Sequence, residues 1–283
     1  MPTFATPKPI NVEIDLMVAN VTITAEDRAD TVVNVDPTNP DNASDVEAAA
    51  ETRVELSGDT MTVKGPGFRK YVGWSNKSRS VDVSITMPTG SSVFGSGVGA
   101  VINLKATGRL GRCEFRSGVG HVHLNQAGSV KLKVFGDILV DEVDGDAKLS
   151  TSTGQLRIGQ VTGTVDAKNS NGSVVIGDIG GSARLRSSNG DIVVDRALGD
   201  VDAVTAHGNI RVDEVRQGVV ELKTAMGEIQ LGVAEGTAAW LDAHTSFGTV
   251  RKQLDGAGEP GPGESTVKVR ARSSYGDIVI RRS

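Results

Sequence analysis

Glycine recurs every nine residues through the middle of this chain. The unbroken part of the series comprises Gly136, Gly145, Gly154, Gly163, Gly172, Gly181, Gly190, Gly199 and Gly208. Gly111 and Gly120 precede it at the same spacing, and Gly218 and Gly227 continue it after small insertions. A fixed period is the sequence signature of a repeat architecture, in which each unit buries its apolar face against the next unit.

The repeat is more regular at eighteen residues than at nine. Two positions after alternate glycines stand branched aliphatic residues: Val122, Ile138, Leu156, Val174, Ile192, Ile210, Ile229, Val250 and Ile278. A second aliphatic column lies four positions after the same glycines, and Lys252 is its single exception. After the other glycines these offsets hold smaller or mixed apolar residues, such as Ala147 and Leu149. This alternation predicts β-strands with one buried face.

Each unit of eighteen residues is therefore interpreted as two strands and two turns. Asn171-Gly172 and Asn189-Gly190 favour turns because both residue types tolerate positive φ. A meander would leave one apolar face uncovered, whereas in a solenoid equivalent strands stack and two walls bury each other. We therefore predict an all-β fold, a parallel β-solenoid of the β-helix or β-roll kind, with about eighteen residues per coil.

Polar residues stand three positions before the alternate glycines: Ser117, Thr151, Asn169, Ser187, Thr205, Thr224, Thr245 and Ser273. In a parallel coil they would stack, and we predict a ladder of hydrogen bonds along the solenoid axis. The alternative is that such residues occupy this position only because they favour the edges of turns.

The two ends of the chain lack this period. Residues 1–95 are predicted to form a β-rich cap ahead of a solenoid over residues 96–283, within one continuous domain. The segment "SDVEAAAE", from Ser44 to Glu51, predicts one short helix capped by Ser44. A cap is expected because an open sheet edge invites aggregation. At the other end, Arg281 and Arg282 of the last strand are expected to protect the edge.

The strand blocks "SNGSVVI", "SNGDIVV" and "SYGDIVI" share the pattern G-[DSN]-[IV]-x-[VI]. Together with the opening "MPTFATPKPINVEIDLMVANVTITAEDRADTVVNVDP" and the later "SGVG", they make the chain similar to a bacterial family labelled "putative adhesin". This is a β-strand-repeat domain of unknown function, number 4097, common in actinobacteria. The resemblance covers essentially the whole chain. It implies a β-solenoid and transfers no catalytic residues.

Charge and composition narrow the classes of partner. The net charge of −5 and the lack of a long basic run predict neither nucleic-acid nor anionic-lipid binding. The chain has no run of about 18 apolar residues, so no membrane span is predicted. The N-terminus does not resemble a signal peptide. The single cysteine, Cys113, gives no support for an oxidising compartment. We therefore expect a cytoplasmic protein.

The histidines and the single cysteine are the residues with the most reactive side chains in this chain. His121 and His123 point to one face of a strand, but a metal site needs a third ligand, so an outer-wall position is favoured. His207 and His244 are interpreted as solvated. Cys113 falls in an inward column and is expected to be a small core residue.

Three further features each have a possible functional interpretation and a structural one. Asp137, Asp191, Asp277 and Glu228 share the column after a glycine, but Gln155, Ser173 and Asn209 interrupt it, so a calcium ladder is not expected. "GSGVG", from Gly95 to Gly99, lacks the lysine of a P-loop and is interpreted as a turn. The loop around Phe68, Tyr71 and Trp74 would dock a partner or form part of the cap.

These observations predict no catalytic, cofactor-binding or metal-binding residue and no cofactor. The favoured hypothesis is a non-enzymatic structural or interaction protein, whose rigid solenoid binds an unknown protein partner or another macromolecule, or self-associates end to end as bactofilin-type β-helices do. The alternative is a carbohydrate-binding or carbohydrate-acting β-helix protein of the pectate-lyase-like kind. That alternative requires carboxylates or aromatic residues clustered along one wall.

Overall fold

The computed structural model describes residues 2–67, 79–254 and 265–283. The chain forms two compact units, unit 1 (Met1–Glu142) and unit 2 (Val143–Ser283), and strand β10 (Ile138–Val143) lies at their boundary. The division at residues 95 and 96 stays a prediction.

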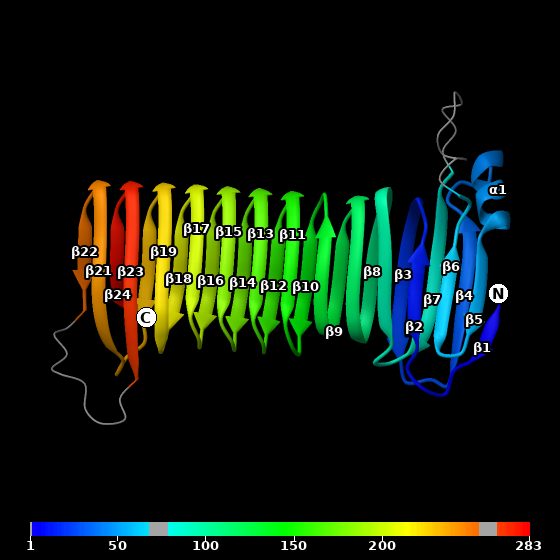
Figure 1. The fold of residues 1–283 in the computed structure, drawn as a ribbon, viewed down its shortest axis with the longest axis horizontal. Helices are drawn as coiled ribbons and strands as arrows, with labels where there is room; N and C mark the ends of the chain where they lie inside the picture. Colours follow the sequence, from blue (N-terminus) through cyan, green and yellow to red (C-terminus); the bar gives the residue numbers. More distant parts are fainter. Residues whose placement is uncertain (1, 68–78, 255–264) are drawn as a thin grey trace. The chain divides into compact units, whose positions relative to one another are not determined.

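Unit 2 is a parallel β-solenoid (Figure 1). The odd wall consists of the odd-numbered strands β11 (Ala147–Thr153), β13 (Val165–Asn171), β15 (Ala183–Asn189), β17 (Val201–His207), β19 (Gly218–Met226), β21 (Ala238–Phe247) and β23 (Thr266–Tyr275). The even wall consists of β12 (Leu156–Val161), β14 (Val174–Ile179), β16 (Ile192–Ala197), β18 (Ile210–Val215), β20 (Ile229–Val233), β22 (Val250–Gln253) and β24 (Ile278–Arg282).

The strand register confirms the predicted coil. Val165 lies opposite Ala183 on the odd wall, and Ile192 lies opposite Ile210 on the even wall, each with an offset of eighteen residues. Both pairings are parallel, whereas neighbouring strands of a meander are antiparallel. The aliphatic columns therefore stack like on like, as the sequence predicts.

The core of unit 2 lies between the two walls. Ile192 and Val194 are fully buried, whereas Val193 between them is half-buried on the outer face. A third buried column holds Val161, Ile179, Ala197 and Val215. Two successive outward residues precede each member of this column, so the strand bends there and the alternation that reveals the other columns is lost.

Steric crowding at the coil corners explains the glycine period. Gly190 has a φ of +146°, and a Cβ there would lie 2.2 Å from the carbonyl oxygen of Gly172 in the preceding coil. At the opposite corner, a Cβ on Gly199 would lie 2.6 Å from the carbonyl oxygen of Gly181. Both turns of a coil bring backbone onto backbone, so a side chain at either position would collide with the neighbouring coil.

The predicted turn geometry at the Asn-Gly dipeptides is wrong. No described residue other than glycine has a positive φ, so Asn171 and Asn189 do not share the conformation of the glycines that follow them. They face outward instead, and Asn189 Nδ2 donates a hydrogen bond to Asn171 Oδ1 at 3.1 Å. The corner of a parallel coil is not a hairpin, so the hairpin preference for two consecutive positive φ values does not apply.

The predicted polar ladder is confirmed, and five of its members donate a hydrogen bond to a glycine carbonyl group of a neighbouring coil: Asn169, Thr205, Thr224, Thr245 and Ser273. Thr224 Oγ1 donates to the carbonyl oxygen of Gly208 at 2.9 Å, and Ser273 Oγ donates to that of Gly227 at 3.1 Å. Ser117, Thr151, Asn169, Thr205, Thr224 and Ser273 are all buried. Ser187 is an exception, because its buried hydroxyl has no partner in the described part of the chain.

The last strands of the sequence do not form the end of the stack. β23 pairs with β19 on one side and β21 on the other, and β24 lies between β20 and β22 in the same way. Arg281 of β24 lies opposite Gly232 and Gln253, so the prediction that Arg281 and Arg282 protect an open edge is wrong. The outermost described coil is β21–β22, and it carries Lys252 exposed at the otherwise aliphatic position.

Unit 1 also stacks parallel strands and ends in antiparallel ones. Its strands are β1 (Thr3–Ala5), β2 (Asn11–Asp15), β3 (Val18–Glu26), β4 (Asp30–Pro37), β5 (Arg53–Ser57), β6 (Thr60–Lys64), β7 (Val81–Pro88), β8 (Ser92–Val119) and β9 (Val122–Val134). β2 lies between β6 and β8, and β3 lies between β7 and β8, all in parallel. β5 and β4 then pair antiparallel with β6 and β7, and they cover that edge of unit 1.

The predicted helix is present as α1 (Ala43–Glu51), but its cap lies two residues earlier than expected. Asn42 is the N-cap, and its side chain accepts a hydrogen bond from the backbone N–H of Ser44 at 3.0 Å. Ser44 lies inside the first turn and is buried. Asparagine and serine cap equally well, so the sequence alone does not choose between them.

Candidate functional site

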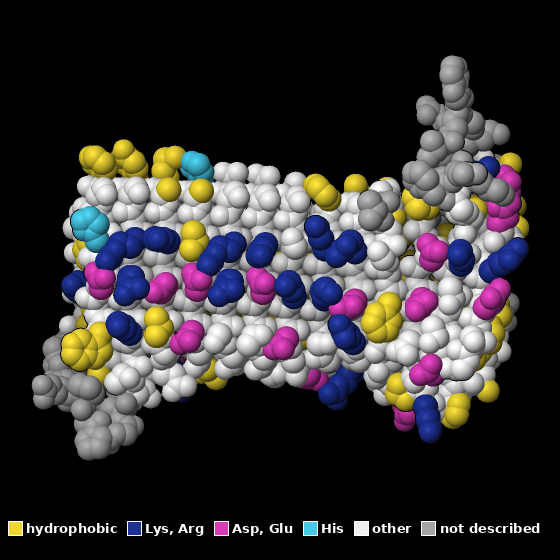
Figure 2. All heavy atoms as spheres, in the orientation of Figure 1, with side chains coloured by type: hydrophobic (Ala, Val, Ile, Leu, Met, Phe, Trp, Pro, Cys, Tyr) yellow, Lys and Arg dark blue, Asp and Glu magenta, His cyan; other side chains and the backbone are white. Residues whose placement is uncertain are grey.

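The outer face of the odd wall is built from files of residues that lie in register from coil to coil. Figure 2 shows two long rows of charged side chains along this face. Successive coils of a parallel stack are about 4.8 Å apart, so each file repeats its functional groups at that spacing. This face therefore presents the same kinds of side chain at regular intervals along the solenoid axis.

One file is basic throughout its charged positions. The basic file contains Lys168, Arg186, Val204, Lys223, Arg272 and His244, which are partners in the strand register. No carboxylate belongs to it. The same repeat position in unit 1 holds Arg116 and Lys133, which also lie opposite each other. The file thus places cations on most of its coils, with Val204 as the one apolar position among those named and with no acid between them.

The neighbouring file mixes both signs of charge. The mixed file contains Lys148, Asp166, Arg184, Asp202, Glu221, Arg270 and Asp242. Its acids engage arginines of both files: Asp202 accepts a hydrogen bond from Arg186 of the basic file, and Glu221 accepts one from Arg270 of the mixed file. Asp242 accepts one from Arg272 of the basic file. The bond from Arg272 lowers the pKa of Asp242 below its ordinary value.

Two lysines of the basic file stand apart from these ion pairs. Neither Lys168 nor Lys223 has an ion-pair partner among the described residues, and both are exposed. The two arginines are tied to carboxylates, whereas the two lysines present unneutralised charge. These lysines are therefore the strongest points for attraction of an anion.

All three aromatic residues of unit 2 lie on two adjacent strands of the odd wall. Trp240, Phe247 and Tyr275 are 68%, 64% and 55% exposed. The rings of Phe247 and Tyr275 stack with centroids 4.7 Å apart and planes 6° from parallel. Met226 continues this row in register, and the row forms the apolar ridge at the corner of the wall in Figure 2. Aromatic side chains are thus displayed outward.

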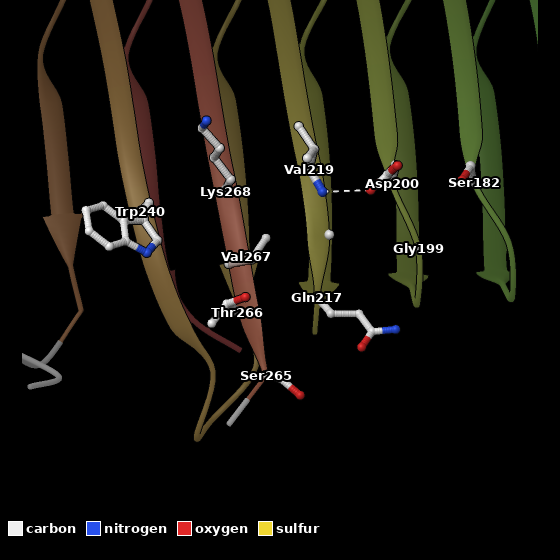
Figure 3. Close-up of a pocket in the computed structure, with 11 residues that line it drawn as sticks. Ser182, Gly199, Asp200, Gln217, Val219, Trp240, Ser265, Thr266, Val267 and Lys268 are labelled. Carbon is white, nitrogen blue, oxygen red and sulfur yellow. Dashed lines mark hydrogen bonds between the residues drawn. The ribbon is translucent and has the colours of Figure 1, made fainter. Parts of the chain in front are cut away.

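A groove lies beside Trp240 at the other edge of the wall. It has a volume of about 840 Å³, and Figure 3 shows Val219, Lys268 and Gln217 along it. Asp200 at its far side accepts a hydrogen bond from the backbone N–H of Val219 at 2.8 Å. The groove therefore combines one exposed indole with amide, hydroxyl and charged groups.

The sequence-predicted histidines do not come together. His121 pairs with Asp137, with Nδ1 and Oδ2 3.1 Å apart, whereas His123 lies 4.0 Å from Asp141. His207 lies opposite Met226 at the corner and His244 opposite Arg272 in the basic file. No group of three or more His, Cys, Asp or Glu side chains suited to a metal ion occurs in the described ranges.

The acids that follow the glycines have a structural role. Asp191 Oδ1 accepts a hydrogen bond from the backbone N–H of Asn209 at 2.7 Å, and Asn209 Oδ1 accepts one from that of Glu228 at 2.8 Å. Asp277 Oδ1 does the same for Thr249 at 2.9 Å. Each of these three side chains thus accepts a hydrogen bond from the backbone of a neighbouring coil, which gives Asp and Asn a structural reason to stand in this column.

Cys113 is fully buried, and burial raises the pKa of its thiol to about 12.

Gly95 to Gly99 belong to β8, so the prediction of a turn there is wrong. A Cβ on Gly95 would lie 2.5 Å from the ring of Phe115, which explains that glycine by packing. Phe68, Tyr71 and Trp74 lie outside the described residues.

Sequence reasoning missed the odd wall as a surface. The basic file stands five residues after alternate glycines and could have been found by reading that column. The aromatic cluster could not, because Tyr275 lies beside Phe247 only through the insertion of β23 between β19 and β21.

Comparison with known proteins identifies a family. The sequence model of the family described as Toastrack DUF4097 matches residues 10–281. The chain matches no curated protein.

Several solved structures are similar to this chain. A "putative adhesin" from Parabacteroides distasonis is 12% identical, with 98% of this chain and 95% of that chain covered and a TM-score of 0.35. One from Bacteroides fragilis is 11% identical, with coverage of 99% and 95% and a TM-score of 0.36. One from Parabacteroides merdae is 11% identical, with coverage of 99% and 94% and a TM-score of 0.33. At these scores the likenesses carry no functional argument.

Proposed function

The chain belongs to the Toastrack DUF4097 family, and we propose that it is a non-enzymatic binding scaffold whose odd wall contacts another macromolecule. One observation carries the proposal: the only aromatic residues of unit 2 are all exposed on β21 and β23, beside the basic file. Exposed aromatic rings supply apolar contact area, and arginine supplies several hydrogen-bond donors, so both suit contact with another macromolecule.

The interior supports the same assignment. Stacked aliphatic columns fill the space between the walls, so the polar and charged groups of unit 2 are distributed over its outer faces and corners. A closed core holds the outward files at fixed spacing. This is the property required of a rigid scaffold rather than of a pocket that closes around a small substrate.

Site-specific photo-cross-linking in the native cell tests the proposal. A photoreactive phenylalanine analogue replaces Val204 in the basic file, and a second variant carries it at Gln230, which faces outward on the even wall. We expect an adduct with a macromolecule at position 204 and none at position 230. Equal adduct formation at both positions, or none at either, would contradict a specific role of the odd wall.

End-to-end self-association is a second candidate function. It is favoured by the partly exposed Leu241, Ala243 and Val250 on the outermost described coil, and it is opposed by Lys252 on the same coil. We expect the wild-type protein to be monomeric by light scattering and Lys252→Ile to associate. Filaments of the wild-type protein would replace the binding scaffold with this second candidate.

The cytoplasmic location predicted from the sequence stays a prediction. Within residues 2–67, 79–254 and 265–283, no helix is long and apolar enough to cross a membrane. Fractionation of native cells followed by immunoblotting tests the location directly. Recovery of the chain in the culture medium or the envelope fraction would overturn the prediction.

A further inference from the structure

We propose that the odd wall binds an extended acidic polysaccharide that lies along the solenoid axis. The inference deepens the proposed function, because it names the chemistry of the partner at the same surface. It rests on three features of that wall: cations in register, small polar residues beside them, and aromatic rings at the end of the row.

The cations of the odd wall require a partner that carries negative charge. Lys168 and Lys223 are exposed and unneutralised, and each neighbours an arginine of the basic file one coil away. A ligand that follows the axis meets a lysine or arginine of this file on four of the coils, and the two lysines among them are unneutralised. A repeating anion gains from every one of these contacts, whereas a neutral polymer or a single small anion does not.

The spacing of the charges disfavours nucleic acid. Val204 interrupts the basic file at its centre, and the carboxylates of Asp202 and Glu221 flank it in the mixed file. A nucleic-acid backbone carries a charge at every phosphate and would meet these carboxylates at close range. An acidic polysaccharide in which charged and uncharged sugars alternate carries a carboxylate only on every second ring, and it fits an interrupted row better.

A flat strip beside the basic file leaves room for sugar rings. It consists of Ser152, Ser170, Ser188, Ala206, Ala225, Ser274 and Ser246, the outward residues that follow the basic file along each strand. These side chains are short, so the strip lies lower than the long cations on one side and the apolar ridge on the other. Serine hydroxyl groups both donate and accept hydrogen bonds, as sugar hydroxyl groups do.

The aromatic residues complete the surface and argue against a protein partner. Trp240 and Phe247 are seven positions apart on β21, which is roughly 23 Å along an extended strand. Asp242 and His244 face outward between them, and Arg270 and Arg272 lie alongside. The core of a protein–protein interface is apolar and depleted of charge, and this surface is not. Separate aromatic platforms with charged groups between them suit a polymer of amphipathic rings.

Binding of hyaluronate, in which a charged and an uncharged sugar alternate, is measured by calorimetry at low salt and tests the inference, with neutral dextran and single-stranded DNA as comparison ligands. We expect binding to hyaluronate alone, and affinity that falls as salt rises. Lys168→Gln and Lys223→Gln should each weaken binding about fivefold. Arg157→Gln makes the same charge change on the even wall and should leave affinity unchanged.

An aromatic variant separates recognition from general attraction. Phe247→Ala should weaken binding of hyaluronate, whereas Leu198→Ala removes an exposed apolar side chain next to Gly199, at the opposite corner of the coil, and should not. Circular dichroism confirms that each variant is folded. Equal binding of DNA, or no effect of Phe247→Ala, would replace the inference with unspecific attraction of polyanions. Absence of any polysaccharide binding, together with a protein adduct at position 204, would refute the inference and leave the proposed function intact.

Discussion

Thr205 donates its hydroxyl hydrogen to the carbonyl oxygen of Gly190, one coil earlier in the stack, at 3.1 Å. Thr205 is 2% exposed, and it lies three positions before the next glycine of the series, Gly208. One bond thus ties a buried polar side chain to the corner that the preceding glycine makes possible. The same relation recurs along unit 2, so the polar ladder and the glycine period together hold neighbouring coils at their corners.

Thr205→Val removes that hydrogen bond and keeps the shape of the side chain. It should lower the free energy of unfolding by about 1 kcal/mol, because a typical intramolecular hydrogen bond contributes that much. Urea unfolding followed by circular dichroism measures the change. Thr205→Ser keeps the hydroxyl and should lose less stability than Thr205→Val. The reverse order would show that the methyl group matters more than the bond.

Gly190→Ala should destabilise the protein by more than about 2 kcal/mol, because it combines an unfavourable positive φ with a Cβ 2.2 Å from a carbonyl oxygen. Gly236 supplies the matched control. Its φ is +73°, but nothing lies within 4 Å of a Cβ there, so Gly236→Ala should lose only about 1 kcal/mol. Thermal unfolding of both variants separates steric crowding from backbone conformation; equal losses would remove crowding as the cause.

Ile192→Asp should unfold or aggregate the chain, whereas Val193→Asp should be tolerated. Ile192 is fully buried between the walls, and an unpaired carboxylate there has no compensating partner. Val193 faces outward and lies opposite Arg211, which would face a new carboxylate favourably. Soluble yield and circular dichroism distinguish the two variants. Comparable damage from both would mean that the faces of β16 are assigned wrongly.

Asp178 links stability to pH. Its carboxylate accepts hydrogen bonds from Arg196 at 3.0 and 2.8 Å, and these bonds hold its pKa below the ordinary value. A depressed pKa contributes stability that is present above the unfolded-state pKa and is lost as pH falls through the folded-state pKa. Asp178→Asn should therefore be slightly less stable than wild type at neutral pH, with the difference vanishing in acid. A difference that grows in acid would contradict the assignment.

Cys113 should be inert in the folded protein. With a pKa of about 12, roughly one thiol in ten thousand is ionised at pH 8, and the side chain is fully buried. Ellman's reagent should therefore not react with the thiol of Cys113 until denaturant is added. Rapid reaction of the native protein would contradict the prediction and show that β8 opens around Cys113.

The sequence by itself determined the coil, because an eighteen-residue period and alternating aliphatic columns have one consistent solution in which like stacks on like. It also determined which face of each strand is buried, since a slip of one residue would turn Ile192 outward and Val193 inward. Both properties follow from the spacing of apolar residues along the chain, so the sequence pattern is enough to predict them.

Only the tertiary structure decided which coil lies outermost and what the odd wall presents. The insertion of β23 and β24 between earlier coils depends on contacts between segments far apart in the chain, and no local pattern encodes it. That insertion places Tyr275 against Phe247 and leaves Lys252 on the outermost described coil. The single break in the aliphatic column is therefore a consequence of long-range strand order, because a lysine is tolerated where no further coil covers it.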